Sequence, residues 1–269
     1  MSKIRKIFWT VSLVTIILIV CLDLFYFGFK NTKARECGNA IMQSCYELGF
    51  AYHNEIEGVK KDTATALKYL EKACNGKYAQ GCQYLGMITA DSQKSVNYYD
   101  SACDYGSLDS CYTLGLLYEN QTMKNLSKSL SYFINLCEQN YKNSCFRTAL
   151  LYSKYDAPND IKDYKKALSI FDNFCDKNDY ASCYAAGWMY YDGKIESLEK
   201  IAKSMDYFTK SCEGGYVYGC YSIDMHEREL KKFEENQRLC DNGSAEHCNK
   251  VAYEYKRGRT VQNNLTKAA

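Results

Sequence analysis

Fourteen of the fifteen cysteines fall into seven pairs, and in every pair the second cysteine follows the first by eight residues. The pairs are Cys37 and Cys45, Cys74 and Cys82, Cys103 and Cys111, Cys137 and Cys145, Cys175 and Cys183, Cys212 and Cys220, and Cys240 and Cys248. Consecutive pairs recur every 28 to 38 residues. A period of this length is typical of a solenoid, in which each repeat packs only against its neighbours. We call the segment around each pair a repeat and number the repeats 1 to 7.

An apolar stripe precedes the first cysteine of a repeat, at seven, four and one residues upstream. Its members in repeats 2 to 5 are Leu67, Leu70, Ala73; Val96, Tyr99, Ala102; Leu130, Phe133, Leu136; and Leu168, Phe171, Phe174. This spacing places the three side chains on one helical face, and it predicts a helix that ends at the cysteine. Repeats 6 and 7 keep part of the stripe, with Met205 and Phe208, then Phe233 and Leu239.

A second apolar segment follows the second cysteine, and it predicts the second helix of each repeat. A small residue recurs four positions after that cysteine, as in Leu48-Gly49, Leu114-Gly115 and Ala186-Gly187, with Ala149 and Ala252 as variants. A small side chain here lets neighbouring helices approach closely. Asp224 breaks the rule, which makes repeat 6 the least regular.

The residues between paired cysteines are rich in Gly, Asn and Asp, for example at 104–107 and 241–244. Such residues are typical of a helix stop and a turn. On one continuous helix, residues eight apart lie about 12 Å apart, whereas a disulfide needs Cα atoms within about 7 Å. Two antiparallel helices joined by a turn bring the cysteines into range, so local pairing is the simplest of the many connectivities that these cysteines allow. Zinc binding or thiol redox chemistry fits less well, because there is no CxxC and His53, His226 and His247 are scattered.

We therefore expect an all-α fold: an α-solenoid with a right-handed superhelix, built over residues 37–269 from about seven antiparallel helix pairs, each with one local disulfide. The final residues, 264–269, resemble the start of one more helix.

The beginning of the chain is typical of an export signal. Lys3, Arg5 and Lys6 lie in a short predicted cytoplasmic tail, residues 1–6, and the apolar segment 7–29 is long enough to span a bilayer as a signal anchor. Residues 30–36 are then a linker. The nearest small-x-small cleavage candidate, at 32–34, has a lysine in its middle, so retention is favoured over cleavage. Cys21 is expected to be a thiol embedded in the membrane.

Export also suits the cysteines, because oxidising compartments preserve disulfides and the cytosol does not. We expect a location in the bacterial periplasm, anchored in the inner membrane by residues 7–29, or secretion. Nucleic acid is excluded as a partner by the net charge of +2, and nothing in the sequence implies a cofactor or a metal.

The repeats resemble Sel-1-like repeats, relatives of the tetratricopeptide repeat. The resemblance covers residues 37–269 and rests on segments such as Lys72-Ala73-Cys74, Gly81-Cys82, Leu85-Gly86, Ser110-Cys111 and Leu114-Gly115. The eight-residue cysteine spacing is similar to that of a cysteine-rich branch, the Helicobacter cysteine-rich protein family. The resemblance implies an adaptor that holds a protein or peptide ligand, a cell-wall peptide among the candidates, along a concave groove. Members of that branch have also been described as penicillin-binding proteins or weak β-lactamases.

The 26 tyrosines suit an interaction surface, since Tyr supplies large amphipathic contact area. Five of them lie one or two residues after the second cysteine of their repeat: Tyr46, Tyr84, Tyr112, Tyr184 and Tyr221. Either some of these line a common face or most pack between helices. The packing alternative is the more common one in such folds.

A serine β-lactamase is the alternative function, and it would show S-x-x-K together with S-D-N and K-T-G. One S-x-x-K occurs, Ser197 to Lys200, in the variable linker of repeat 5, and both companion motifs are absent. Histidine is too sparse for a metallo-β-lactamase. No catalytic residue is assigned, and we expect a binding protein rather than an enzyme.

Overall fold

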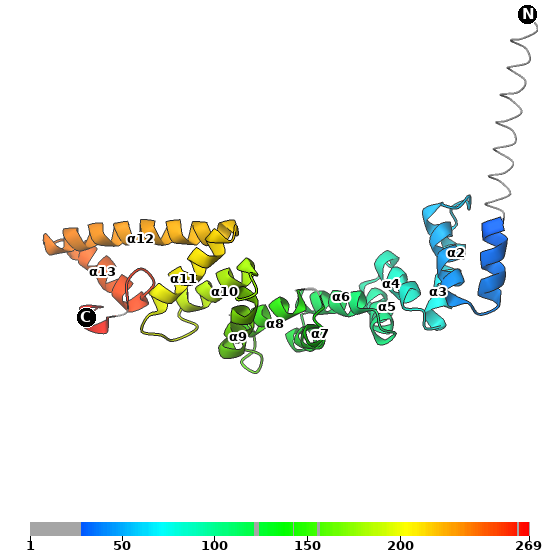
Figure 1. Cartoon of the computed structure of the whole chain (residues 1–269), viewed down its shortest axis with the longest axis horizontal. Coiled ribbons are helices and arrows are strands. Elements are labelled where there is room, and N and C mark those ends of the chain that lie inside the picture. The colour runs from blue at the N-terminus through cyan, green and yellow to red at the C-terminus, as the bar shows by residue number, and fades with distance from the viewer. Residues whose placement is uncertain (1–27, 121–123, 142, 155–156, 263, 269) are drawn as a thin grey trace, which may run out of the picture. The chain divides into compact units, whose positions relative to one another are not determined.

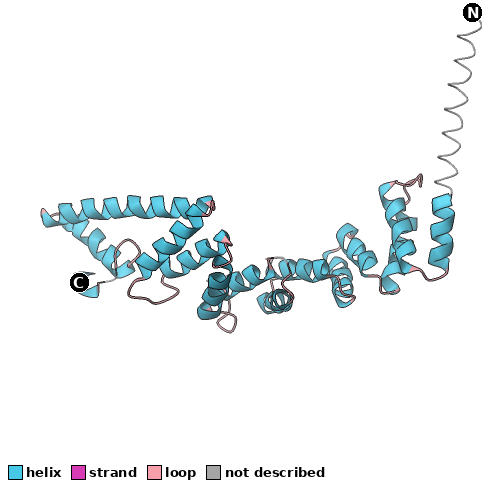
Figure 2. Ribbon diagram, in the orientation of Figure 1, coloured by secondary structure: helices cyan, strands magenta, loops and turns pink. Residues whose placement is uncertain are grey.

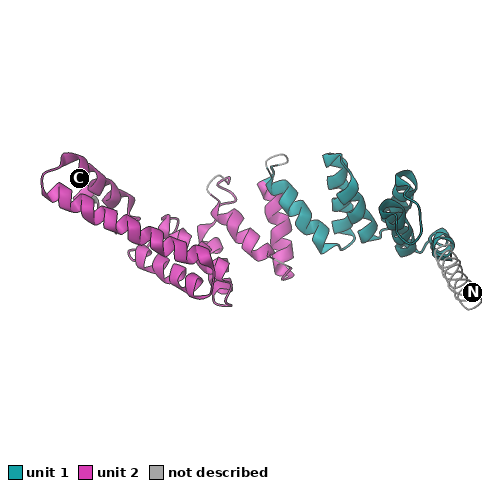
Figure 3. Ribbon diagram, turned by 90° about the horizontal axis from the view of Figure 1, so that it is seen from above, with its two compact units in different colours: residues 1–125 teal, residues 126–269 magenta. Residues whose placement is uncertain are grey.

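The computed structural model describes residues 28–120, 124–141, 143–154, 157–262 and 264–268 (Figure 1). Within these ranges the regular elements are all helices, which confirms the predicted all-α class (Figure 2). The chain divides into two compact units, the first ending at Asn125 and the second beginning at Leu126 (Figure 3). Each unit is built from helices that pack in chain order.

The described part of the first unit begins with a helical segment, residues 28–38. Five helices follow: α2 (Met42–Asn54), α3 (Thr63–Asn75), α4 (Ala79–Ile88), α5 (Ser92–Asp104) and α6 (Leu108–Glu119). Each of the helices α2 to α5 contacts the next one along the chain. This is the pattern of stacked antiparallel hairpins that the period predicts.

The second unit has the same organisation up to its middle. Its helices are α7 (Leu126–Glu138), α8 (Ser144–Ser153), α9 (Tyr164–Cys175), α10 (Tyr180–Tyr191), α11 (Lys200–Glu213), α12 (Val217–Asp241), α13 (Ala245–Arg257) and α14 (Leu265–Ala268). Neighbours again pack in chain order. The short α14 agrees with the expectation of a helical start at the end of the sequence.

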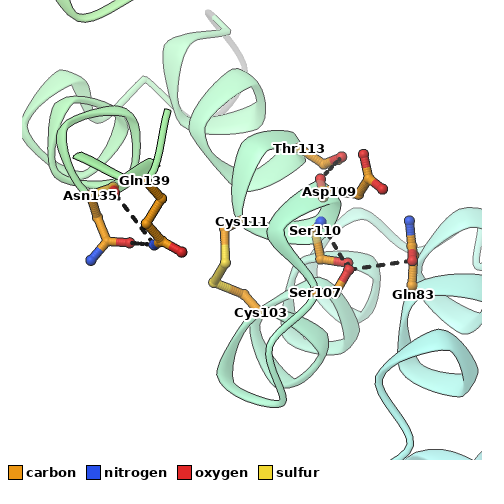
Figure 4. The surroundings of a disulfide bond; sticks show 9 residues. All are labelled: Gln83, Cys103, Ser107, Asp109, Ser110, Cys111, Thr113, Asn135 and Gln139. Atoms are coloured by element: carbon orange, nitrogen blue, oxygen red, sulfur yellow. Dashed lines mark hydrogen bonds between the residues drawn. A yellow bond between two sulfur atoms is a disulfide. The ribbon is translucent and has the colours of Figure 1, made fainter. Parts of the chain in front are cut away.

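Disulfides join the end of one helix to the beginning of the next in all seven repeats. Their Cα–Cα distances run from 4.5 to 4.8 Å, well inside the range that a disulfide needs. Figure 4 shows the bond between Cys103 on α5 and Cys111 on α6, beside Ser107, whose hydroxyl accepts a hydrogen bond from the backbone N–H of Ser110 and donates one to Gln83. The solenoid prediction, with one local disulfide per repeat, is confirmed.

In several repeats an aspartate caps the N-terminus of the first helix of the pair. Asp62, Asp91 and Asp163 each accept a hydrogen bond from the backbone N–H three residues on. Such caps satisfy a backbone donor that the helix itself leaves without a partner. The hydroxyl and the amide of Thr65 both donate to Asp62, and they lower the pKa of that carboxyl.

The small residue after the second cysteine makes a close contact with the next repeat. A Cβ added to Gly49 would lie 2.7 Å from Cγ of Leu70, and one added to Gly187 would lie 2.6 Å from Cε1 of Phe208. Leu70 and Phe208 are fully buried, and both stand four residues before a first cysteine. The predicted role of the small residue is therefore confirmed, since the facing side chain takes the space that a Cβ would need.

A second small position, eight residues before the first cysteine, was not predicted. Its members in repeats 2, 4, 5 and 6 are Ala66, Ser129, Ala167 and Ser204, and all four are fully buried. The carbonyl oxygens of Ala66 and Ser204 lie 3.0 and 3.2 Å from the Cβ positions built on Gly49 and Gly187. Backbone thus approaches backbone, and both partners of the contact must be small.

Repeats 6 and 7 depart from the expected pairing of separate helices. A single helix of 25 residues, α12, carries Cys220 near its beginning and Cys240 near its end. The second helix of repeat 6 and the first helix of repeat 7 are therefore one element. The segment 222–232 contains no Gly, Pro or Asn, so nothing in it stops the helix.

The continuous helix explains why Asp224 is tolerated. In repeats 1, 2 and 5 the glycine at this position faces the side chain four residues before the next first cysteine. In repeat 7 that residue is Asn236. On one helix, residues 224 and 236 lie about 18 Å apart, so they never meet. Asp224 instead lies exposed and pairs with Arg228 at 3.0 Å.

The predicted segments at the beginning of the chain are described only in part. Residues 1–6, Cys21 and all of the predicted anchor before residue 28 lie outside the described ranges. The segment 30–36, predicted as a linker, is helical, and Lys33 within it bonds Glu47 of α2 at 2.7 Å. Among the described helices, none combines the length and the apolar character that a membrane crossing requires.

Candidate functional site

Four tyrosines of the second unit form a contiguous cluster, which we call the tyrosine cluster: Tyr184 on α10 and Tyr216, Tyr218 and Tyr221 at the beginning of α12. The ring centroid of Tyr184 lies 5.5 Å from that of Tyr216 and 6.1 Å from that of Tyr218. The ring centroid of Tyr218 lies 5.4 Å from that of Tyr216 and 6.4 Å from that of Tyr221. Each ring therefore has an aromatic neighbour within the distance at which such pairs attract.

The local sequence explains why the outer members of the cluster face solvent. Gly215 adopts a φ of +89°, which reverses the chain after α11, and Tyr216 is the N-cap residue of α12. The first turn of α12 then projects outward, with Tyr218 54% and Tyr221 61% exposed. Val217 beside them is 50% exposed. Large side chains with apolar surface are thus exposed together at the N-terminal end of α12.

The inner side of the tyrosine cluster rests on the core. The ring centroid of Tyr184 lies 5.9 Å from that of the fully buried Phe208 and 6.2 Å from that of Trp188. Burial raises the pKa of Tyr216, so its phenol stays protonated at neutral pH and can donate a hydrogen bond. The cluster is therefore a supported aromatic surface with polar groups at its rim.

The five tyrosines that follow a second cysteine were expected either to line a common face or to pack between helices, and they divide between these two alternatives. Tyr84 is buried, and its hydroxyl accepts a hydrogen bond of 2.7 Å from Nδ2 of Asn54. Tyr46, Tyr112 and Tyr184 are half-buried, whereas Tyr221 is exposed. Packing between helices thus accounts for most of them. Tyr216 and Tyr218 were missed, although the sequence Tyr-Val-Tyr at 216–218 is an available signal.

A groove lies between α12 and α13 in the same unit, with a volume of about 620 Å³. We call it the α12/α13 groove. It is lined by Glu229, Lys232, Phe233 and Asn236 of α12, by Glu246, Asn249, Lys250, Tyr253, Glu254 and Arg257 of α13, and by Thr260. Its size falls in the usual range for ligand sites.

Most charges of the α12/α13 groove are already engaged. Lys250 bonds Glu246 at 2.7 Å, and Arg257 lies 4.0 Å from Glu254. The hydroxyl of Thr260 donates to Glu254 at 3.0 Å and to Glu229 at 3.4 Å. Lys232 is the exception, because no residue in the described ranges forms an ion pair or a hydrogen bond with it.

A buried polar group lies behind the groove, where α10 meets α12. The hydroxyl of Tyr191 donates to Oε2 of Glu229 at 3.5 Å, and burial raises the pKa of Tyr191 to about 12. Burial also lowers the pKa of His226, whose Nδ1 is enclosed without a hydrogen-bond partner among the described atoms. His226 is therefore held neutral at physiological pH.

The S-x-x-K segment does not form a helical Ser-Lys pair. A serine and a lysine three residues apart face each other when both lie on one helix. Here α11 begins at Lys200, so Ser197 precedes it, and the Ser197 hydroxyl accepts a hydrogen bond of 3.2 Å from the backbone N–H of Glu199. No group of His, Cys, Asp and Glu that could hold a metal is found in the part of the chain that the structure describes.

Comparison with known families identifies the repeats. The Sel1 repeat model matches residues 43–78, 76–107, 108–141, 181–216 and 245–269, which together exceed half of the chain. The chain therefore belongs to the Sel1 repeat family. All of α12 falls between two matched segments, in agreement with its departure from the regular pairing.

Relatives and solved structures agree with this assignment. Cytochrome c oxidase assembly factor 7 of Danio rerio is 34% identical over 93 residues, and its Homo sapiens counterpart is 29% identical over 93 residues. Each match covers 30% of this chain and 40% of the relative, so the chain spans well under half of their length. A Sel1 repeat protein from Oxalobacter formigenes superposes with a TM-score of 0.58 at 20% identity, over 88% of this chain and 72% of that one, which shows a shared fold.

Proposed function

We propose that this chain is an extracytoplasmic scaffold that binds a protein or peptide ligand through its solenoid surface. The observation that carries the proposal is the tyrosine cluster, in which Tyr218 and Tyr221 are more than half exposed. A stacked array of helix pairs offers such a surface without any catalytic centre.

The composition of the cluster suits protein binding. Tyr is enriched in the buried cores of interfaces and among the residues that dominate binding energy. Each aromatic side chain can bury about 150 to 250 Å² against a partner, at a small cost in rotamer entropy. The ring of Tyr184 contacts the buried ring of Phe208 and also the exposed ring of Tyr218. The exposed ring is therefore partly held in position before a partner binds.

The extracytoplasmic part of the proposal is supported by the disulfides. Seven bonds, one in each repeat, would be reduced in the cytosol and retained in the periplasm or outside the cell. The apolar segment 7–29 supports export and a membrane anchor in the same proposal. Membership of the cysteine-rich branch remains a prediction that rests on the cysteine spacing.

The names of the relatives point in the same direction, because an assembly factor acts on other proteins. A cell-wall peptide is the second kind of ligand that fits an extracytoplasmic groove. Weak β-lactam hydrolysis remains a prediction from the family resemblance alone.

Site-specific photo-cross-linking tests the proposal. The photoreactive residue p-benzoylphenylalanine would replace Tyr221 in one variant of the full chain and Leu198 in a control, because Leu198 lies in the same unit and is 84% exposed. We expect Tyr221 to yield a cross-linked product of defined mass in cells, and Leu198 to yield none. If both positions give the same products, or neither gives any, the tyrosine cluster is not the binding surface.

A further inference from the structure

We propose that the tyrosine cluster, together with Asp179, binds an arginine side chain of the partner protein. This inference rests on the proposed scaffold function, and it names the chemistry that the tyrosine cluster recognises. It follows from the spacing of the rings, from the cations that cover other tyrosines of the chain, and from a carboxylate beside the cluster that lacks an ion pair among the described residues.

Three rings of the cluster are close enough together for one cation to lie within reach of all of them. The centroids of Tyr184, Tyr216 and Tyr218 are 5.4 to 6.1 Å apart, and the ring planes are inclined to one another by 47 to 57°. None of these pairs is stacked, so no ring lies flat on the face of another. A cation about 4 Å above the plane of the three centroids would be about 5 Å from each, which is within the range of a cation–π contact.

Other tyrosines of the chain already carry a lysine over the ring. Four of them stand seven residues after a second cysteine, and in each case the lysine Nζ lies 5.3 to 5.7 Å from the ring centroid: Lys30 over Tyr52, Lys166 over Tyr152, Lys203 over Tyr190 and Lys267 over Tyr255. Among the described residues, no lysine or arginine takes such a position over a ring of the tyrosine cluster. The cluster is therefore open to a cation that a partner supplies.

The repeat pattern places Asp179 beside the cluster. Asp179 is the N-cap residue of α10, as Tyr216 is of α12, and both stand four residues before a second cysteine. The residue after a second cysteine contacts this position of the next repeat, as Tyr184 contacts Tyr216 and as Gln83 contacts Ser107. Burial is the largest cause that raises the pKa of Tyr216, the neighbouring phenols add to it, and the Asp179 carboxylate adds to it as well.

The charge of Asp179 has no counter-ion in the described part of the chain. Its half-buried carboxylate accepts a hydrogen bond of 2.6 Å from the hydroxyl of Ser182, which is a neutral group. Glu213, exposed three residues before Tyr216, likewise forms no ion pair with a described residue. The faces of aromatic rings are also electrically negative, so rings and carboxylates favour the same kind of ligand.

The cations nearest to these carboxylates in sequence are engaged with other groups. The Nζ of Lys177 lies 5.5 Å from the ring centroid of Phe174, and Lys210 bonds Asp176 at 3.2 Å. On α12, Arg228 pairs at 3.0 Å with the aspartate one turn before it. Of these three cations, Lys177 alone lacks a carboxylate partner among the described residues, against the two carboxylates that lack a cation. The unpaired charge beside the cluster is therefore net negative.

The first unit repeats the pair of rings without the carboxylate. Tyr46 and Tyr78 stand at the positions of the two inner rings of the cluster, and their centroids lie 5.7 Å apart. The N-cap residue that corresponds to Asp179 is there Ile41, which is 48% exposed. The rings thus belong to the repeat pattern, whereas the carboxylate beside them is a feature of repeat 5.

A guanidinium suits both parts of the site. It is planar, so it can stack on an aromatic ring while its N–H groups donate hydrogen bonds to a carboxylate. It is also more weakly hydrated than an ammonium group, so less hydration is lost when it enters a partly buried place. A proline or leucine side chain would contact the rings but would leave the Asp179 carboxylate without a partner. The surface therefore favours arginine.

Fluorescence anisotropy with the full chain tests the inference. The probes are capped pentapeptides of sequence Gly-Leu-Arg-Leu-Gly with an uncharged fluorophore, and citrulline or lysine replaces the arginine in the matched controls. Citrulline keeps the shape of arginine but removes its charge. We expect the arginine probe to bind about fivefold more tightly than the citrulline probe, and the lysine probe to have an intermediate affinity.

Two results would contradict this expectation. Equal binding of the arginine and citrulline probes, or no binding of the arginine probe, would overturn the inference. Equal binding of the arginine and lysine probes would overturn its assignment to arginine.

Removal of a single charge locates the site. Asp179→Asn should reduce the preference for the arginine probe to about twofold or less, and asparagine is as good an N-cap residue as aspartate, so α10 is kept. Asp224→Asn is the matched control, because it removes the same charge from a carboxylate that already pairs with Arg228. If the two variants show the same preference, the arginine binds elsewhere.

A second pair of variants tests the rings. Tyr218→Leu keeps apolar surface but removes the aromatic face, so the preference for the arginine probe should fall. Tyr253→Leu is its control, because Tyr253 is 60% exposed on α13 and lies outside the tyrosine cluster. An unchanged preference in Tyr218→Leu would refute the contact between the cation and the rings.

The outcome is separable from that of the scaffold proposal. Cross-linking from Tyr221 in cells, without a preference for the arginine probe, refutes only the ligand chemistry. A preference that Asp179→Asn removes, without cross-linking from Tyr221, refutes only the binding of a partner in cells.

Discussion

Removal of one disulfide should loosen its own repeat and little else. In the double variant Cys103→Ala/Cys111→Ala, the lost bond joins residues with a sequence separation of 8. Closing a loop of this length stabilises the native state by about 2.6 kcal/mol at 25 °C in the chain-entropy model. Alanine avoids placing a hydroxyl at Cys111, which is buried, and it avoids the free thiol that a single substitution would leave.

Hydrogen exchange under native conditions can resolve this change. If α5 and α6 open together, a loss of about 2.6 kcal/mol speeds exchange of their protected amides by about 80-fold. Because repeats in a solenoid couple mainly to their neighbours, amides of α9 and α10 should keep their protection. Mass spectrometry of peptic peptides separates the two regions.

A second double variant is the matched control. Cys175→Ala/Cys183→Ala removes a bond with the same separation, so the faster exchange should move to α9 and α10. Unchanged exchange in α5 and α6 of the first variant would refute the view that each disulfide stabilises its own helix pair. Equal acceleration in every helix would show instead that the array unfolds as one body.

Three further outcomes follow from the core, the buried histidine and the S-x-x-K segment. Phe208→Ala should lower the free energy of unfolding of the second unit by about 3 to 5 kcal/mol in urea denaturation, and a loss under about 1 kcal/mol would contradict its role beside Gly187. Burial lowers the pKa of His226, so its contribution to stability is full above its ordinary pKa and is lost as the pH falls through that value toward the lower folded pKa. Denaturation at about pH 7.5 and about pH 5.5 should therefore show a smaller decline in His226→Phe, and an unchanged decline would exclude this group as its source. Ser197→Ala should leave any nitrocefin hydrolysis unchanged, and loss of turnover would restore the serine-enzyme alternative.

The sequence specified the helix pairs because their signals are local. A first cysteine, an apolar stripe and a turn rich in glycine recur within each repeat, and Leu70 and Phe133 are buried as the stripe predicts. The small position eight residues before the first cysteine escaped notice, because alanine and serine also occur at many exposed sites. Ser204 is recognised only when its carbonyl is seen beside Gly187.

The candidate sites were less accessible to prediction, because they depend on contacts between repeats. Asp224 was recognised as an exception, but only the continuous α12 shows that it has no facing residue. The α12/α13 groove follows from that continuity. Tyr218 and Tyr221 differ from the buried Tyr84 in exposure rather than in local sequence, so composition alone could not separate them.

The continuous α12 also limits how such an array can change in length during evolution. Between repeats 1 and 2, residues 55–62 form an irregular connection, where gain or loss of a whole repeat by duplication or deletion leaves both flanking helices intact. Between repeats 6 and 7 the same event would have to cut through a helix of 25 residues. We therefore expect related arrays to gain or lose the last two repeats, and the α12/α13 groove with them, as one piece.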